Sequence, residues 1–251
     1  MTRVLAPLVT ATGLLAVWQG IVVATGVPPY ILPPPVAVLN VLVTRYELLL
    51  HHFWVTAFEI LLGFVIGSGL GFVSALCLVS FRRARLWLLP VLVASQALPV
   101  FALAPLLVLW LGYGMASKVG MAVLIIFFPV TAAFFDGLRR TDQAWLELAR
   151  SMDAGGRAVL FQIRLPAALP ALGSGLRVAA SVAPIGAVVG EWVGSSAGLG
   201  HLMLQANARM QIDVMFAALF TLAVMALALY FAVDRSVRQL VPWQSETVDH
   251  D

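Results

Sequence analysis

The sequence predicts an all-α, polytopic membrane protein with six transmembrane helices, in a single domain over residues 1–243 with its core at 55–240. Of the 251 residues, 61% are hydrophobic and 11% are charged, whereas soluble domains have about 45–50% apolar and about 25% charged residues. A chain of this size buries only part of its surface, so much of its apolar surface must face lipid. The composition excludes an ordinary soluble enzyme, a disordered chain and a typical nucleic-acid-binding protein.

The first two spans are uncharged runs close to the roughly 20 residues that cross a bilayer. Residues 4–27 form the first run, which is too long for the apolar part of a signal peptide. Prolines over 28–35 then require an extended link, because proline lacks the N–H that a helix uses. Residues 60–81 form the second run, in which the spacing of Gly63 and Gly67 lets helices approach closely. We favour the interpretation that these glycines pack against helices of the same chain over the alternative that they contact a second copy.

The remaining spans follow from the same criterion and are predicted over residues 86–111, 119–135, 168–190 and 214–233. Three prolines should kink the third span, which a membrane tolerates only where neighbouring groups satisfy the freed carbonyls. The glycine- and serine-rich stretch 192–208 is expected to form an external or partly re-entrant loop. The polar tail 244–251 is expected to be disordered.

Arginine placement predicts the orientation of these spans. Six spans place both termini on one side, and if that side is cytoplasmic, twelve of the fifteen basic residues lie inside, as the positive-inside rule requires. The inside residues are Arg3, Arg82, Arg83, Arg85, Arg139, Arg140, Arg150, Arg157, Arg164, Arg177, Arg235 and Arg238. The outside residues are Arg45, Lys118 and Arg209. The net charge of +3 therefore indicates orientation rather than affinity for an acidic partner.

The sequence lacks the patterns that would support catalysis. A phosphate-binding loop needs Gly before its Lys, and Lys118, the only lysine, follows Ser117. The four histidines lack the spacing of a metal site, and no nucleophile stands beside a base. The chain is predicted to be a conduit and not an enzyme, with no metal or cofactor of its own.

A few polar residues inside the spans are candidates for a translocation pathway, because ionisable groups are costly in the bilayer. Glu59 opens the second span, where a structural role is favoured. Glu191 closes the fifth span, where the alternative is a carboxylate bonded to its own loop. The other candidates are two polar residues, each with a proline at a predicted kink. Their alternative role is to donate a hydrogen bond to a backbone carbonyl that the kink leaves without a partner. The full set is Gln96, Pro99, Ser181, Pro184, Glu191 and Glu59.

The most polar segment, residues 137–167, is the predicted cytoplasmic loop between the fourth and fifth spans. Thr141 or Asp142 can cap a helix there, and Trp145, Leu148 and Ala149 then share one face of that helix. Such an amphipathic helix can lie on the lipid surface, serve as a plain loop element, or dock a soluble partner.

The spacing within this loop resembles the EAA loop of ABC importer permeases, whose pattern is E-A-A, three residues, Gly, nine residues and I-x-L-P. The matching positions are Glu147, Ala149, Ile163, Leu165 and Pro166. Leu148 replaces the middle Ala, and Asp153 stands where the family usually has Gly, with Gly155 and Gly156 just beyond it. The turn geometry at Asp153 is left open, since Gly adopts a positive φ far more readily than Asp does.

The resemblance extends over nearly the whole chain and is typical of the subfamily that imports nitrate, sulfonates, taurine and thiamine-pyrimidine precursors. It is carried by residues 31–39, 102–114, 165–179 and 188–203. The stretches 191–200 and 207–219 are most similar to permeases of hydroxymethylpyrimidine-type precursors, which favours that substrate over a sulfonate, taurine or nitrate anion.

This resemblance implies the type I importer permease fold in a bacterial inner membrane. Two permease copies would form the pore, two ATPase subunits would bind ATP and Mg²⁺ beneath it, and an external binding protein would deliver the solute. The second copy is predicted to be identical, so that the permease is a homodimer, and a paired homologous permease is left open as the alternative. The implied ATPase-coupling residues are Ala144, Trp145, Glu147, Leu148, Ala149, Asp153, Gly155, Gly156, Ile163, Leu165 and Pro166. The alternatives are a secondary transporter or channel without an ATPase, and a structural membrane subunit.

Overall fold

A computed structural model describes residues 2–243 of the chain, with side chains over 9–94 and 98–243. The predicted tail 244–251 lies outside the described residues. The helices are α1 (Thr2–Thr25), α2 (Pro35–Thr44), α3 (Tyr46–Ser80), α4 (Arg82–Ala97), α5 (Val100–Leu111), α6 (Met115–Arg139), α7 (Gln143–Ser151), α8 (Gly156–Ala158), a π-helical turn (Val159–Arg164), α9 (Leu165–Gly194), α10 (Leu199–Ala208) and α11 (Ile212–Leu240).

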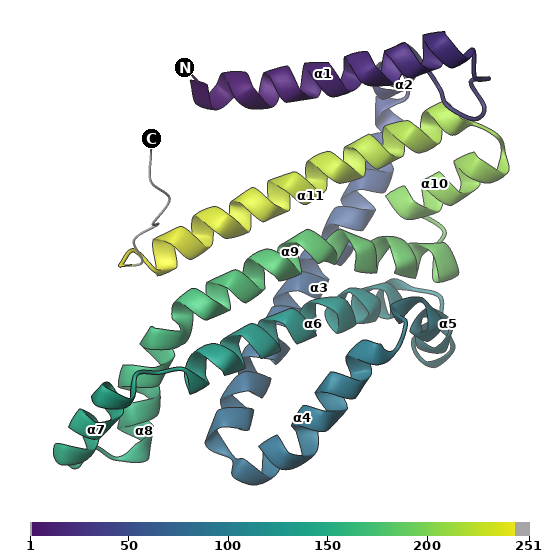
Figure 1. The fold of residues 1–251 in the computed structure, drawn as a ribbon. Coiled ribbons are helices and arrows are strands. Elements are labelled where there is room, and N and C mark those ends of the chain that lie inside the picture. The colour runs from purple at the N-terminus through teal and green to yellow at the C-terminus, as the bar shows by residue number, and fades with distance from the viewer. Residues whose placement is uncertain (1, 244–251) are drawn as a thin grey trace.

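The centre of the molecule is α6, which is packed between α3 and α9 (Figure 1). Glycines on both neighbours make this packing close. A Cβ atom added to Gly63 of α3 would lie 2.5 Å from the Cβ of Ala122, and one added to Gly186 of α9 would lie 2.7 Å from the Cα of Ala122. Gly63, Gly67 and Gly71 of α3 therefore pack against α6 within the chain, as predicted from their spacing.

The other helices surround this centre. On α1, the Trp18 ring lies 5.6 Å from the ring of Phe216 and 5.8 Å from that of Phe220, which joins α1 to α11. The predicted loop 192–208 is largely helical, because α9 continues to Gly194 and α10 then packs against α9, α11 and α3. Its buried residues include Leu199 and Leu202.

Four helical segments of the described chain are long and apolar enough to cross a membrane: Tyr46–Ser80, Met115–Arg139, Gly156–Gly194 and Ile212–Leu240. They correspond to the second, fourth, fifth and sixth predicted spans. The first predicted span corresponds to α1. The third is not continuous, because the chain breaks between α4 and α5 at Leu98, which takes the extended conformation that a following proline imposes.

The structure extends several spans beyond their predicted ends. Helix α3 begins at Tyr46 rather than at residue 60, and α6 begins at Met115 rather than at 119. The uncharged-run criterion stopped at Glu59 and at Lys118, but both side chains are buried and paired with each other. Lys118, predicted to lie in an outer segment, is thus part of a helix.

We expect Gly186→Ala to destabilise the fold by about 1–3 kcal/mol, because its new Cβ would meet backbone of α6 that cannot move aside. Gly69→Ala on α3 is the matched control, since no described atom lies within 4 Å of its added Cβ. Thermal unfolding of the two purified proteins in detergent measures the difference, and equal stability of both variants would contradict the packing described here.

Candidate functional site

The predicted amphipathic helix is α7, and it presents an apolar face to the outside. Asp142 caps it, because the Ala144 N–H donates to Asp142 Oδ1 at 2.9 Å. Trp145 is 54% exposed, Leu148 62% and Met152 74%, although all three are large and apolar. This face borders a groove of about 540 Å³.

The groove is closed on its other side by residues from three segments of the chain. Its remaining lining residues include Ile163 and Pro166 of the predicted coupling set, together with Ala154, Gln162, Ala167 and Trp243. Trp243 was not predicted, because it lies far from the loop in sequence. We call the surface formed by Trp145, Leu148, Met152 and Trp243 the docking face.

Asp153 takes the left-handed conformation at the end of α7, with φ of 56°. Around it the Ala154 N–H donates to the Ala149 carbonyl at 2.9 Å, and the Asp153 N–H donates to the Arg150 carbonyl at 3.0 Å. This pair of bonds is the Schellman arrangement, which usually has Gly at the left-handed position. Asp153 thus performs the turn that the family's Gly would make.

The rest of the predicted coupling set is spread around this loop. Ala144 and Glu147 are exposed, and Glu147 lies about 200° around the helix from Trp145, on the side away from the docking face. Gly155 precedes α8 and Gly156 is its first residue. Leu165 begins α9 and packs against a core cluster that includes Leu138.

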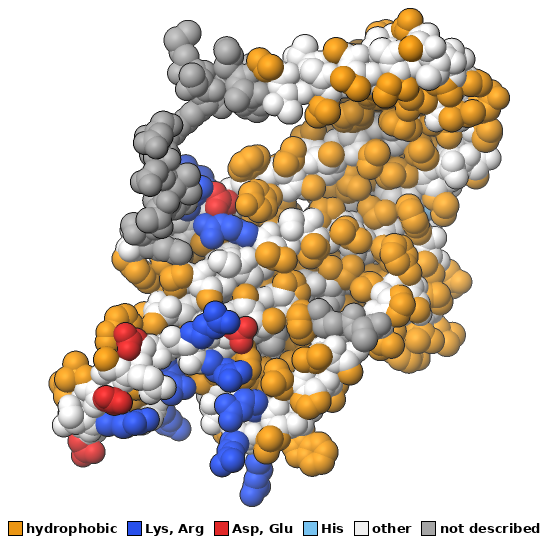
Figure 2. Space-filling view, in the orientation of Figure 1, with side chains coloured by type: hydrophobic (Ala, Val, Ile, Leu, Met, Phe, Trp, Pro, Cys, Tyr) orange, Lys and Arg blue, Asp and Glu red, His pale blue; other side chains and the backbone are white. Residues whose placement is uncertain are grey.

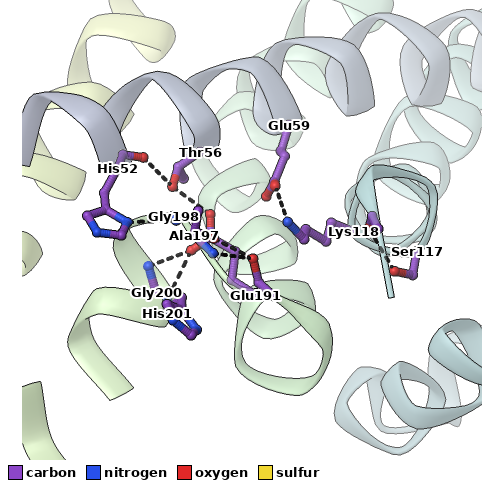
Figure 3. Close-up of polar contacts among 12 residues, drawn as sticks. His52, Thr56, Glu59, Ser117, Lys118, Glu191, Ala197, Gly198, Gly200 and His201 are labelled. Atoms are coloured by element: carbon purple, nitrogen blue, oxygen red, sulfur yellow. Dashed lines mark hydrogen bonds and ion pairs between the residues drawn. The ribbon is translucent and has the colours of Figure 1, made fainter. Parts of the chain in front are cut away.

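A buried polar cluster lies among α3, α6 and the end of α9 (Figure 3). It is at the opposite end of α9 from Pro166, which borders the docking face. Lys118 of α6 donates to Glu59 Oε1 of α3 at 2.9 Å, and both side chains are at least 92% buried. The other carboxylate oxygen of Glu59 is buried without a hydrogen-bond partner among the described residues. An ion pair in such a place depends on both partners, because either charge alone would be buried uncompensated.

Glu191, near the end of α9, is fully buried and binds the chain that follows it. It accepts hydrogen bonds from the Thr56 hydroxyl at 2.5 Å and from the Gly200 N–H at 2.5 Å, with a longer one from the His201 N–H at 3.3 Å. These N–H groups open α10, where a carboxylate is favoured. Glu191 is thus hydrogen-bonded to its own loop, which the sequence allowed as the alternative to a pathway role for this residue.

Helix α3 holds the same loop from the other side. The Leu199 N–H donates to Thr56 Oγ1 at 2.8 Å, and the Gly198 N–H donates to His52 Nδ1 at 2.9 Å. Gly198 has φ of 115°, and an added Cβ would collide with the Glu191 carboxylate. Both the backbone conformation and the lack of space therefore require Gly at this position. The turn 195–200 is therefore clamped between α3 and α9.

Sequence reasoning missed His52, Thr56 and Lys118 as members of this cluster. The available signal was the spacing of His52, Thr56 and Glu59, which places three polar groups on one face of a helix, as Figure 3 shows. We call Glu59, Lys118, Glu191, Thr56 and His52 the buried network.

The other pathway candidates whose side chains are described, Pro99, Ser181 and Pro184, do not join the buried network. Ser181 is exposed and donates to the Val178 carbonyl at 2.7 Å, whereas Pro184 is buried in α9. Pro99 caps the start of α5. The Gln96 side chain lies outside the described residues.

Replacing Lys118 by Met leaves Glu59 as a buried carboxylate without its cation. We expect the Lys118→Met protein to lose about 3–5 kcal/mol of stability against unfolding, measured by denaturant titration in detergent. The double variant Glu59→Gln, Lys118→Met removes both charges and should recover most of that loss. A double variant as unstable as the single one would show that the pair is not coupled in this way.

Comparisons with known proteins agree with this architecture. The family described as "Binding-protein-dependent transport system inner membrane component" matches residues 67–246. A probable ABC transporter permease protein of Haemophilus influenzae is 58% identical, over 92% of this chain and 95% of that protein. The formylaminopyrimidine transport permease protein ThiX of Halalkalibacterium halodurans is 35% identical, over 87% of this chain and 88% of that protein.

Further relatives at 36%, 32% and 29% identity are named for riboflavin, aliphatic sulfonate and taurine transport. An inward-facing structure of the MetNI methionine ABC transporter superposes with a TM-score of 0.65 at 19% identity, over 77% of this chain and 96% of that chain, which shows a common fold. The resemblance found in the sequence is thereby confirmed. The chain belongs to the family of inner-membrane components of binding-protein-dependent transport systems, and it is a permease subunit of an ABC importer rather than an enzyme.

Proposed function

We propose that the docking face binds a partner ATPase, and that the chain works as one of two permease copies with both termini in the cytoplasm. The observation that carries this proposal is the apolar face of α7, which is left exposed although no hydrocarbon region is expected at this end. On the face shown in Figure 2, the Lys and Arg side chains gather toward the same end of the molecule, which supports a cytoplasmic location. The ATPase, and not this chain, would bind ATP and Mg²⁺.

The structure offers a direct mechanical path from the docking face to the buried network. From Gly156 to Gly194 the chain is helical without a break, over 39 residues, or about 58 Å at 1.5 Å per residue. Its first part borders the docking face, and its last turn carries Glu191. Movement of α7 by a closing ATPase would therefore displace Glu191 and the turn 195–200 together, which supports alternating access as the mechanism.

We propose a neutral nitrogen heterocycle of the thiamine-pyrimidine type as the substrate, with a sulfonate, taurine or nitrate anion as the alternative. Two of the relatives are named for formylaminopyrimidine and riboflavin transport, and both of these compounds are nitrogen heterocycles. The buried network also holds two carboxyl groups against one ammonium group, a balance that does not favour the passage of an anion. A binding protein outside the membrane would set the final selectivity.

Leu148→Asp is expected to abolish co-purification of the ATPase, because it places a charge at the centre of the docking face. Gln143→Ala, on the opposite side of α7, is the matched control and should retain the ATPase. Affinity purification of the tagged permease from cells that express the whole transporter measures both. An ATPase retained equally by Leu148→Asp would refute docking through this face.

Uptake of labelled hydroxymethylpyrimidine and of labelled taurine, compared in cells with the whole transporter, tests the substrate class. We expect pyrimidine uptake that needs ATP and is lost in Leu148→Asp, with taurine uptake at background. ATP-dependent uptake of taurine without uptake of the pyrimidine would contradict the proposed substrate and favour the sulfonate alternative. Uptake that survives ATP depletion would contradict the ATP-driven mechanism itself.

A further inference from the structure

A separate cavity of about 460 Å³ lies between α7, the end of α3 and the helical segment that starts at Gly156. Its walls carry three arginines, Arg150, Arg157 and Arg164. Apart from Ala154, it shares no lining residue with the groove beside the docking face. Its volume is within the range of small-molecule sites.

The positive charge in this cavity has no ion-pair partner among the described residues. None of the three arginines forms an ion pair or a side-chain hydrogen bond within the described part of the chain. The Nε–H of Arg164 is buried and has no acceptor among the residues that the structure describes, which is costly for a donor attached to a charged group. Three guanidinium groups around one cavity also repel each other unless an anion lies between them.

The cavity lies where two helical segments that are long and apolar enough to cross a membrane have their arginine-bearing ends. The candidate span of α3 ends at Ser80, the candidate span of α9 begins at Gly156, and both residues line the cavity. The remaining wall is apolar and includes Val79, Leu146 and Leu160. Basic pockets at this level between membrane helices match the phosphate groups of lipids.

We propose that Arg150, Arg157 and Arg164 form a binding site for a phosphate group at the cytoplasmic membrane surface. Guanidinium groups bind phosphate oxygens through pairs of parallel hydrogen bonds, and the buried Arg164 Nε–H supplies a donor without an acceptor in the described part of the chain. The phosphate can belong to a phospholipid headgroup or to a free phosphate ion. This site does not depend on the docking role of α7, because it needs only the described cavity.

Two other uses of the arginines are weaker. They could neutralise the carbonyl end of α3, but no arginine side chain donates to its last carbonyls in the described contacts. They could instead pair with carboxylates of the ATPase, but Arg164 is half-buried and its Nε lies behind the surface. The second use is one of the outcomes of the test below.

The test is native mass spectrometry of the purified, delipidated permease, titrated with phosphatidylglycerol. Dioleoylglycerol, which lacks the phosphate, is the control ligand. We expect Arg157→Gln and Arg164→Gln to weaken phosphatidylglycerol binding by about ten-fold or more. Arg83→Gln is the matched control: it removes an exposed arginine outside the cavity and should change binding by less than about two-fold.

Addition of inorganic phosphate distinguishes the two sources. Displacement of phosphatidylglycerol by millimolar phosphate would assign the site to the free ion, and resistance to phosphate would assign it to the lipid. The proposal is overturned if the permease binds dioleoylglycerol as tightly as phosphatidylglycerol. It is also overturned if the Arg157→Gln variant binds phosphatidylglycerol as tightly as the unchanged protein. It is also overturned if Arg157→Gln loses the ATPase while lipid binding is unaffected.

Discussion

Close contact on both sides of Ala122 is the constraint on which the rest of the molecule depends. Gly63 of α3 and Gly186 of α9 meet this one residue of α6 from two directions, so three helices share a centre that has no room for larger side chains. Lipid offers no hydrophobic drive for helices to associate, and such backbone proximity is what holds them together in a membrane. The crossing also brings α3 and α9 within reach of the same loop.

The buried network follows from that crossing. Because α3 and α9 approach α6 so closely, Glu59 reaches Lys118, and Glu191 reaches Thr56, across the helix interfaces. The same side chains clamp the turn 195–200 and thereby the start of α10. Polar groups in lipid must find partners inside the protein, and here they do so by joining three helices. Sliding of α3 along α6 would break both the Gly63 contact and the ion pair, and sliding of α9 along α6 would break the Gly186 contact.

This rigidity determines how a signal can cross the molecule. One continuous helical segment, Gly156–Gly194, borders the docking face at its start and carries Glu191 near its end. That end is tied to α3 through Thr56. Displacement of α7 would then move α3, α6 and α9 as a body, since close-packed interfaces shift as units rather than deform continuously. The phosphate cavity lies where α3 and the start of this path meet, so its occupant would contact the moving unit at its membrane edge.

The sequence predicted the helical class, the glycine packing and the loop pattern, because each depends on local spacing. It placed the ends of α3 and α6 wrongly at Glu59 and Lys118, since a charge ends an uncharged run in sequence but not a helix in which that charge is paired. The pairing joins residues 59 positions apart, which no local pattern reveals. The same holds for Trp243, which reaches the docking face from the far end of the chain. For Asp153, the sequence left the turn open, and the structure shows Asp in the conformation expected of Gly.

The most direct test of this account is a distance between α3 and α9 in the working transporter. Spin labels at exposed Val65 and Val178, in a background with Cys77 replaced by Ser, allow pulsed electron resonance in the nucleotide-free and ATP-bound states. If α3, α6 and α9 move as one body, the mean distance between the labels should agree in the two states to within about 2 Å. A change of several ångströms would show that the helices slide at Ala122 and would contradict the account.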